Sequence, residues 1–253
     1  MGVSPVLAVH ALEKGALSTH FPTHRNIRTG ETPVSRTGVG GPAHPVELCA
    51  LSRALFAQGP LLRRKLQHWR PRICPFHRLL PRVPQNASVL DVGCGCGLFL
   101  GLLAKSGHDI RGTGFDVSTD AIAVAQRMAQ QVGSNLQFLQ LDVNDPWPAG
   151  PFDVVSIIDV MHHVPPAGQR AVLKTAASRV APGGILLYKD MCRRPRWRAA
   201  ANRLHDLLLA RQWIHYLPIE QVEQWATEDG LRLEHAERIN MLWYGHELRV
   251  FRR

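Results

Sequence analysis

An aspartate and three glycines in one short stretch are the residues of this chain best suited to bind a cofactor. Asp91 lies near the end of an apolar, β-branched run, and Gly93, Gly95 and Gly97 follow it at alternate positions. Glycines are needed where the backbone must approach a ligand closely, because side chains would hold the ligand away. The leucine-rich segment 98–105 that comes next predicts a helix. This order of strand, glycine-rich turn and helix is typical of the first half of a nucleotide-binding βαβ unit.

The spacing of these glycines argues against two familiar phosphate-binding loops. A dinucleotide fingerprint has its third glycine three residues after the second, where this chain has Leu98, and no Gly-Lys-Ser/Thr of a P-loop follows. The run Asp-x-Gly-x-Gly-x-Gly after a strand resembles the first motif of class I S-adenosylmethionine-dependent methyltransferases. That cofactor carries an amino acid tail, a ribose and an adenine but no phosphate. The alternative is a glycine-rich turn in another kind of α/β domain.

Acidic residues end the next two predicted strands. The segment 110–116 reads as a strand ending at Asp116, about twenty residues past the glycine loop, where an acid would bond the ribose hydroxyls. A third strand, 136–141, leads to Asp142, and the resemblance implies that this acid binds the adenine amino group. Asp145 precedes a proline and is expected to be a turn residue.

Each part of the cofactor is thereby assigned to one part of this region. The glycines should line the amino acid tail, and Asp91 should lie on the side of its ammonium group. The predicted cofactor-binding residues, neighbouring positions included, are Asp91, Gly93, Cys94, Gly95, Gly97, Asp116, Val117, Asp142, Val143 and Asp159.

Two histidines follow the fourth predicted strand, 152–159. His162 and His163 stand in the sequence Val-Met-His-His-Val-Pro-Pro, which resembles the Leu-His-His segment of small-molecule and quinone-type methyltransferases. Strand 4 should lie beside strand 1, where open α/β sheets bind ligands, so residues 159–163 should face the methyl group and its acceptor. Because an imidazole titrates near neutral pH, either histidine is a candidate general base. The alternative is that one or both cap the following helix or pack under the cofactor.

The remaining segments continue the alternation of helices and strands. The pattern predicts helices at 119–132, 168–180, 199–213 and 218–229, a Pro-Gly-Gly turn before a fifth strand at 185–190, and closing strands at 231–239 and 242–252. We therefore predict an α/β fold, a Rossmann-like seven-stranded, mostly parallel sheet with helices on both faces and an antiparallel last strand. The resemblance covers roughly residues 84–253.

The chain divides into three predicted regions. Residues 1–45 show no sustained periodicity and are rich in Gly, Pro, Thr and Ser, which predicts a disordered extension with no assigned function. Residues 46–84 predict a basic helical cap of two short amphipathic helices and a third helical turn. The resemblance implies that this cap covers the cofactor and forms one wall of the substrate site, whereas the alternative is a solvated basic face. Residues 85–253 form the predicted methyltransferase domain.

The composition indicates which partners and which cell compartment suit this chain. The 253 residues carry a net charge of +10, which favours an anionic partner such as nucleic acid, an acidic carrier protein or an anionic membrane surface. No apolar run approaches the roughly 18 residues of a membrane span. Five cysteines, two of them in the glycine loop, favour a reducing, cytoplasmic location over a disulfide framework. Cys94 and Cys96 lack zinc-site spacing, so no metal is predicted.

The sequence thus predicts an S-adenosylmethionine-dependent methyltransferase for a small organic or lipid-like acceptor, free or carrier-bound. The protein would align the acceptor for in-line attack on the methyl group and remove a proton where needed. An arginine-rich segment with Trp197, at 193–198, would form a cationic rim around the pocket or a solvated basic loop. Two alternatives remain: an RNA methyltransferase, suggested by the charge, and an inactive adaptor that keeps the fold. The Asn/Asp-Pro-Pro-Tyr/Phe motif of methyltransferases acting on bases or glutamine is missing.

Overall fold

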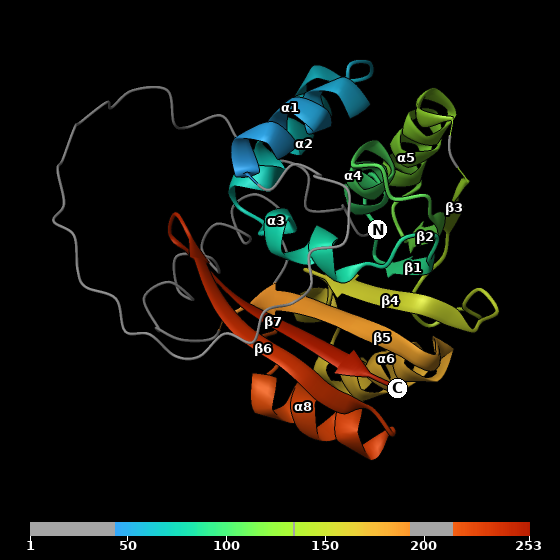
Figure 1. Cartoon of the computed structure of the whole chain (residues 1–253), viewed down its shortest axis with the longest axis vertical. Coiled ribbons are helices and arrows are strands. Elements are labelled where there is room, and N and C mark those ends of the chain that lie inside the picture. The colour runs from blue at the N-terminus through green and yellow to red at the C-terminus, as the bar shows by residue number, and fades with distance from the viewer. Residues whose placement is uncertain (1–43, 134, 193–214) are drawn as a thin grey trace, which may run out of the picture.

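A twisted seven-stranded sheet forms the centre of the molecule (Figure 1). The computed structural model describes residues 44–133, 135–192 and 215–253. The strands are β1 (Ser88–Val92), β2 (Arg111–Asp116), β3 (Leu136–Gln140), β4 (Phe152–Ile158), β5 (Val180–Met191), β6 (Arg232–Met241) and β7 (Tyr244–Arg252). Their order in the sheet is β3-β2-β1-β4-β5-β7-β6. Strands β1 to β5 are parallel and β7 runs antiparallel to both of its neighbours, which confirms the predicted fold class.

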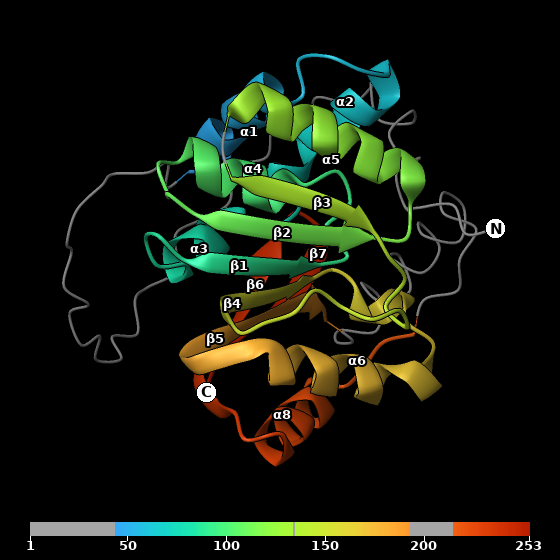
Figure 2. The ribbon, with the colours of Figure 1, turned by 90° about the vertical axis from the view of Figure 1, so that its right-hand side faces the viewer.

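Helices cover both faces of the sheet (Figure 2). They are α1 (Pro45–Leu55), α2 (Leu61–Trp69), α3 (Phe76–Leu79), α4 (Leu98–Lys105), α5 (Thr119–Val132), α6 (Pro166–Arg179) and α8 (Ile219–Glu228), with 3-10 turns η1 (Arg70–Arg72), η2 (Leu80–Arg82) and η3 (Met161–His163). Helices α1, α2, α4 and α5 lie on one face, and α6 and α8 lie on the other. None of the helices in the described part of the chain has the length and apolarity needed to cross a membrane.

The period of two along each strand divides the apolar side chains between two cores. Val89 of β1 and Val154 of β4 are fully buried in the core under α4 and α5. The next residues, Leu90 and Val155, are equally buried in the core under α6 and α8. Because both faces are covered, the central strands are apolar at nearly every position, as expected of parallel strands.

Local capping explains why α5 has the predicted bounds. The Ser118 hydroxyl accepts a hydrogen bond from the backbone N–H of Ala121 at 3.3 Å, and Gly133 ends the helix with a φ of +64°. A serine N-cap and a left-handed glycine just after the last turn are the usual signals of a helix start and stop.

The N-terminal helices share the core of the domain. Leu48 and Leu55 of α1 are buried in the same cluster as Leu100 of α4. An ion pair adds to this contact: Arg78 pairs with Glu237 of β6 at 2.7 Å. Residues 46–84 therefore pack against α4 and reach β6 through Arg78.

The structure corrects one boundary near the centre of the sheet. The Pro-Gly-Gly segment, predicted to be a turn before strand 5, lies within β5, which begins at Val180 and pairs there with Phe152. The register with β4 shifts between Phe152 and Val154, so the extra residues form a bulge and the strand continues through them. Residues 1–43 of the predicted extension 1–45, the arginine-rich segment 193–198 and the helix 199–213 lie outside the described residues, and Pro45 belongs to α1.

Candidate active site

The glycine loop joins the carboxyl end of β1 to the start of α4. Its three glycines all have positive φ, between +54° and +79°. A Cβ added to Gly97 would lie 2.6 Å from the Phe138 ring, whereas one added to Gly95 would meet nothing within 4 Å. Packing therefore requires a glycine at position 97. At position 95 the positive φ favours glycine, and the space next to this residue is open.

The two cysteines of the loop are packing residues. The Cys94 side chain lies over Gly114 of β2, where an added Cβ would come within 2.9 Å of its sulfur. Burial raises the pKa of the Cys94 thiol well above its ordinary value, and burial also raises that of Cys96. Such thiols are neutral and unreactive at neutral pH. In the described ranges, no cluster of three or more His, Cys, Asp or Glu side chains is arranged to hold a metal.

Asp91 is a buried carboxylate directly beneath the loop. It is 3% exposed, and the Ser156 hydroxyl of β4 donates a hydrogen bond of 2.7 Å to it. Burial raises the pKa of Asp91 to about 7, although the bond from Ser156 and the nearby Arg70 guanidinium act in the opposite direction. A cationic ligand beside a carboxylate with a pKa near 7 would favour its ionised form and would be bound by that negative charge.

Asp116 ends β2 beside the loop, and Val117 follows it. The Asp116 carboxylate accepts hydrogen bonds from the backbone N–H groups of Gly95 (3.0 Å) and Ser118 (2.8 Å). It thus fixes the loop and still has acceptor capacity for a ligand hydroxyl. Val117 is 56% exposed, an apolar surface next to this acid.

Asp142 and Asp145 build the turn after β3. The Asp142 backbone N–H donates to the Asp145 carboxylate at 2.8 Å, which gives Asp145 the turn role predicted for it. The Asp142 carboxylate accepts two hydrogen bonds from Asn144. The carbonyl of Val143 accepts a bond from the Trp147 indole at 3.0 Å, and this bond ties the turn to the core.

Asp159 lies at the end of β4 in an ion-pair triad. It has a φ of +57°, and its carboxylate contacts the Lys189 ammonium at 2.5 Å and the Arg70 guanidinium at 3.5 Å. Burial alone would raise its pKa, but these two cations outweigh burial and hold the pKa of Asp159 well below its usual range. Lys189 is fully buried, whereas the Arg70 side chain is 36% exposed. The triad joins β4 and β5 to η1, which belongs to the N-terminal helical region 46–84.

The histidine pair lies in η3, at the carboxyl end of β4. Nδ1 of His162 contacts the Asp190 carboxylate at the end of β5, and the same carboxylate accepts from the His162 backbone N–H at 3.2 Å. The His163 ring packs on His162 with centroids 4.0 Å apart. Burial, then His162, lowers the pKa of His163 to about 3, so this ring is neutral and weakly basic.

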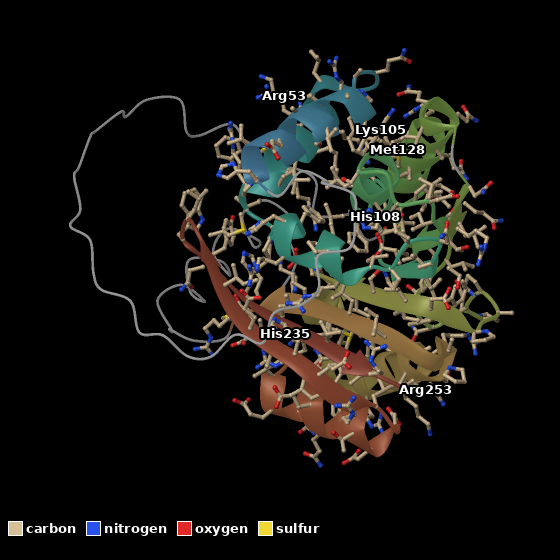
Figure 3. The ribbon with its side chains drawn as sticks, viewed as in Figure 1. Arg53, Lys105, His108, Met128, His235 and Arg253 are labelled. Carbon is tan, nitrogen blue, oxygen red and sulfur yellow. The ribbon has the colours of Figure 1, made fainter. Side chains whose placement is uncertain are left out.

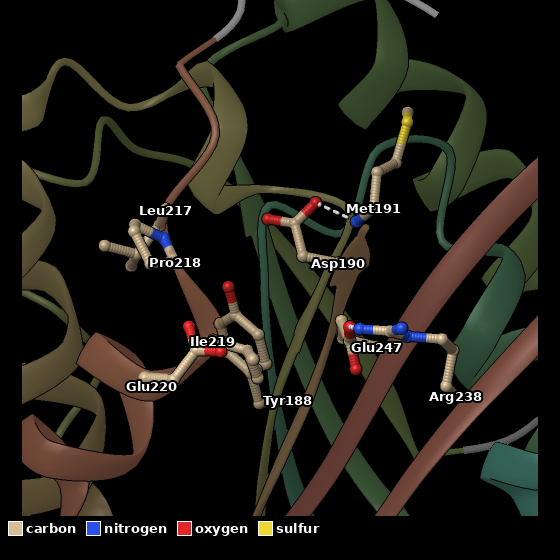
Figure 4. Close-up of a pocket in the computed structure, with 9 residues that line it drawn as sticks. All are labelled: Tyr188, Asp190, Met191, Leu217, Pro218, Ile219, Glu220, Arg238 and Glu247. Carbon is tan, nitrogen blue, oxygen red and sulfur yellow. Dashed lines mark hydrogen bonds and ion pairs between the residues drawn. The ribbon is translucent and has the colours of Figure 1, made fainter. Parts of the chain in front are cut away.

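A cavity of about 210 Å³ lies beside Asp190, the residue that contacts His162 (Figure 4). Tyr188, Asp190 and Met191 line it from β5, and Leu217 to Glu220 line it from the segment that enters α8. Arg238 and Glu247 close its other side through an ion pair. In the close-up, the Tyr188 hydroxyl and the Asp190 carboxylate both point into the space between these walls.

Sequence reasoning missed four residues of this region: Arg70, Ser156, Lys189 and Asp190. Asp190 carried a usable signal, because an acid at the end of a central parallel strand follows the rule that identified Asp116. Lys189 and Ser156 lie inside apolar strands and gave no signal of their pairing, because their partners Asp159 and Asp91 are 30 and 65 residues away in sequence.

The fold and this site define a class I S-adenosylmethionine-dependent methyltransferase. The glycine cradle leaves open space before Gly95, and acids end β1 and β2 beside it, which fits a cofactor with an ammonium group and ribose hydroxyls. Residues 63–236, more than half of the chain, match the methyltransferase domain family, and the chain belongs to that family.

Named relatives agree with this class. The chain is 28% identical over 179 residues to the ubiquinone biosynthesis O-methyltransferase of Erwinia tasmaniensis, a match covering 64% of this chain and 72% of that protein. With the same enzyme of Cronobacter sakazakii it shares 34% identity over 131 residues, 47% of this chain and 52% of that protein. The magnesium protoporphyrin IX methyltransferase of Synechocystis PCC 6803 has a similar fold, with a TM-score of 0.59, 18% identity, and coverage of 81% of this chain and 93% of that one.

Proposed function

We propose that this enzyme methylates a hydroxyl oxygen of a small aromatic, quinone-like acceptor. The observation that carries the proposal is the contact between His162 and Asp190 at the carboxyl ends of β4 and β5. The O-methyltransferases among the relatives support an oxygen acceptor. The match covers 72% and 52% of these two relatives.

His162 would act as the general base. A carboxylate at Nδ1 holds the proton on that nitrogen, so Nε2 carries the lone pair of the neutral ring. S-adenosylmethionine supplies an electrophilic methyl group on its sulfonium. As the acceptor oxygen bonds to that carbon and the carbon–sulfur bond breaks, the hydroxyl proton would pass to His162. Asp190 would stabilise the resulting imidazolium, and His163, with its low pKa, would only pack against the ring.

The loop and three acids would hold the cofactor. Asp91 would meet the ammonium group, Asp116 the ribose hydroxyls and Asp142 the adenine amino group. Gly93, Cys94, Gly95 and Gly97 would line the amino acid tail, and Val117, Val143 and Asp159 would complete the surroundings. The exposed apolar surface of Val117 beside Asp116 supports this arrangement, because an adenine ring needs an apolar platform next to the ribose.

The cavity beside Asp190 would receive the acceptor. Its aromatic and aliphatic walls, at Tyr188, Met191, Leu217 and Ile219, suit a ring or the start of an apolar tail. The helical region 46–84 would cover the cofactor. It carries exposed basic residues such as Arg53 on the outer side of α1 (Figure 3), which suits a lipid-like or carrier-bound acceptor near an anionic surface.

Two measurements test the proposal. Calorimetric titration with S-adenosylmethionine and S-adenosylhomocysteine should give micromolar binding. A radiolabelled methyl donor should then label catechols and hydroxylated quinols but leave total RNA unlabelled, and Asp190→Asn should lower turnover without weakening cofactor binding. Labelled RNA with steeply salt-dependent binding would favour the RNA methyltransferase instead.

A further inference from the structure

The two edges of the sheet differ in how they are protected. Strand β6 forms one edge and carries charged residues such as Arg232, Glu234 and Glu237, with a register shift between Leu233 and His235. Charges and bulges are the usual means by which proteins keep an edge strand from pairing with another chain. Strand β3 forms the other edge with the sequence Leu-Gln-Phe-Leu-Gln, which has no charge, no proline and no register shift against β2.

The backbone groups that β3 presents outward follow from its bonds to β2. The Asn135 carbonyl accepts from Gly112 and the Leu141 N–H donates to Asp116, so the odd-numbered residues point toward β2. In a parallel pair the residues alternate, and therefore Leu136, Phe138 and Gln140 point their N–H and C=O groups outward. Among the described residues, no strand pairs with this side of β3.

A side chain already occupies one of these outward positions. The Gln126 amide of α5 donates a hydrogen bond of 3.1 Å to the Phe138 carbonyl. A side-chain amide in this place does what the backbone N–H of a neighbouring strand would do. An open groove of about 610 Å³ runs along the same edge, and its walls are uncharged: Gln126, Ala129, Gln130, Gly133, Leu136, Gln137, Phe138 and Leu139.

We propose that β3 pairs antiparallel with β3 of a second copy of this chain, which would make a two-fold dimer with one continuous sheet. The outward groups are self-complementary about Phe138: Phe138 would face its own copy, and Leu136 would face Gln140 of the second copy. Two-fold interfaces use the same patch on both subunits, so the pattern of donors and acceptors must match itself. No like charges meet in this register, and the groove beside it is lined by the small residues Ala129 and Gly133 of the α5 end.

The net charge of the chain predicts how salt affects the dimer. Each copy carries +10, so the copies repel at low ionic strength, although the interface itself is uncharged. Screening shortens this repulsion to within about 8 Å at physiological salt. Pairing should therefore strengthen as salt is added, the opposite of what an ion-paired interface would do.

Sedimentation velocity of the full chain, from low to high micromolar concentration, tests this inference. The expected result is a concentration-dependent species of twice the 28.2 kDa chain mass, more populated at higher salt. Gln140→Pro removes an outward N–H that β2 does not use, and the two-fold axis doubles the loss, so the dissociation constant should rise about tenfold or more. The matched variant Gln140→Thr keeps the N–H and should leave the dimer intact.

Three results would overturn the inference: a monomer at every concentration, a dimer that dissociates with added salt, or a dimer that Gln140→Pro leaves unchanged. Circular dichroism shows whether the proline variant is folded. Should it not fold, Gln137→Lys takes its place, because a lysine at a strand edge opposes pairing without altering the backbone. The test uses no methyl acceptor, so its outcome is independent of the proposed activity.

Discussion

Replacing Asp91 with asparagine should move the difference in stability between variant and wild type in favour of the variant as the pH rises. Burial raises the pKa of Asp91 from 3.8 to about 7, so the native state holds this proton more tightly than the unfolded chain does. The stability contributed by the protonated form is complete below the unfolded pKa. It is lost as the pH rises from there through 7.

The structure sets the size of this effect. A shift of about three pKa units corresponds to about 4 kcal/mol of native stability lost once Asp91 is ionised. Roughly 2.5 kcal/mol of that falls between about pH 5 and pH 8. The asparagine introduced by Asp91→Asn cannot ionise and can still accept the Ser156 hydrogen bond, but its buried amide N–H₂ costs about 1–3 kcal/mol at every pH.

Urea unfolding of wild type and Asp91→Asn at several pH values measures the effect. The difference between the two proteins isolates Asp91, because other titrating groups contribute equally to both. We expect the difference in the free energy of unfolding to move in favour of the variant by about 2.5 kcal/mol from about pH 5 to pH 8. A difference that stays constant across this range would show that Asp91 titrates normally and would refute the reasoning.

Four further perturbations have defined outcomes. Asp116→Ala should weaken S-adenosylmethionine binding about 10-fold or more without unfolding the domain, and unchanged affinity by calorimetry would contradict the ribose assignment. Gly97→Ala should destabilise the fold by more than the roughly 1–2 kcal/mol of left-handed strain, because the added Cβ meets Phe138. Gly95→Ala should cost that strain alone, and equal shifts in melting temperature for the two variants would exclude this packing explanation. Lys189→Met should cost about 3–5 kcal/mol by leaving Asp159 buried without its closest cation, and adding Asp159→Asn should recover part of the loss; a double variant no more stable than the single one would rule out this account. Wild-type affinity for S-adenosylmethionine should fall about tenfold per pH unit below about 7, as Asp91 takes up its proton, and a profile as flat as that of Asp91→Asn would argue against an ammonium contact.

The sequence predicted best the elements that local signals define. The bounds of α5 were predicted to the residue, because Ser118 and Gly133 mark its ends. The succession of strands and helices along the chain followed from the alternation of apolar runs and amphipathic segments, and the acids at the strand ends followed from that succession. The bulge in β5 was missed, because a Pro-Gly-Gly sequence indicates a turn unless the register of the neighbouring strand is known.

The site was harder to predict wherever its chemistry depends on contacts between distant segments. Sequence marked His162 as a candidate base but could not show that Asp190 contacts it, because the two lie on different elements 28 residues apart. The same holds for Asp159. Its place after β4 suggested a ligand contact, and only the structure reveals the two cations, Lys189 and Arg70, that its carboxylate already binds.

The position of β7 has a consequence for how the protein is made. Tyr244–Arg252 is the last strand in sequence but lies between β5 and β6, and eight of its nine residues are buried. During synthesis one edge of β5 therefore stays unpaired until β7 leaves the ribosome. Strand β6 likewise has no strand to pair with before β7 is made. Strands β1 to β4 can pair while the chain is still growing, but the half of the sheet that carries Asp190 is completed only after translation of the final strand.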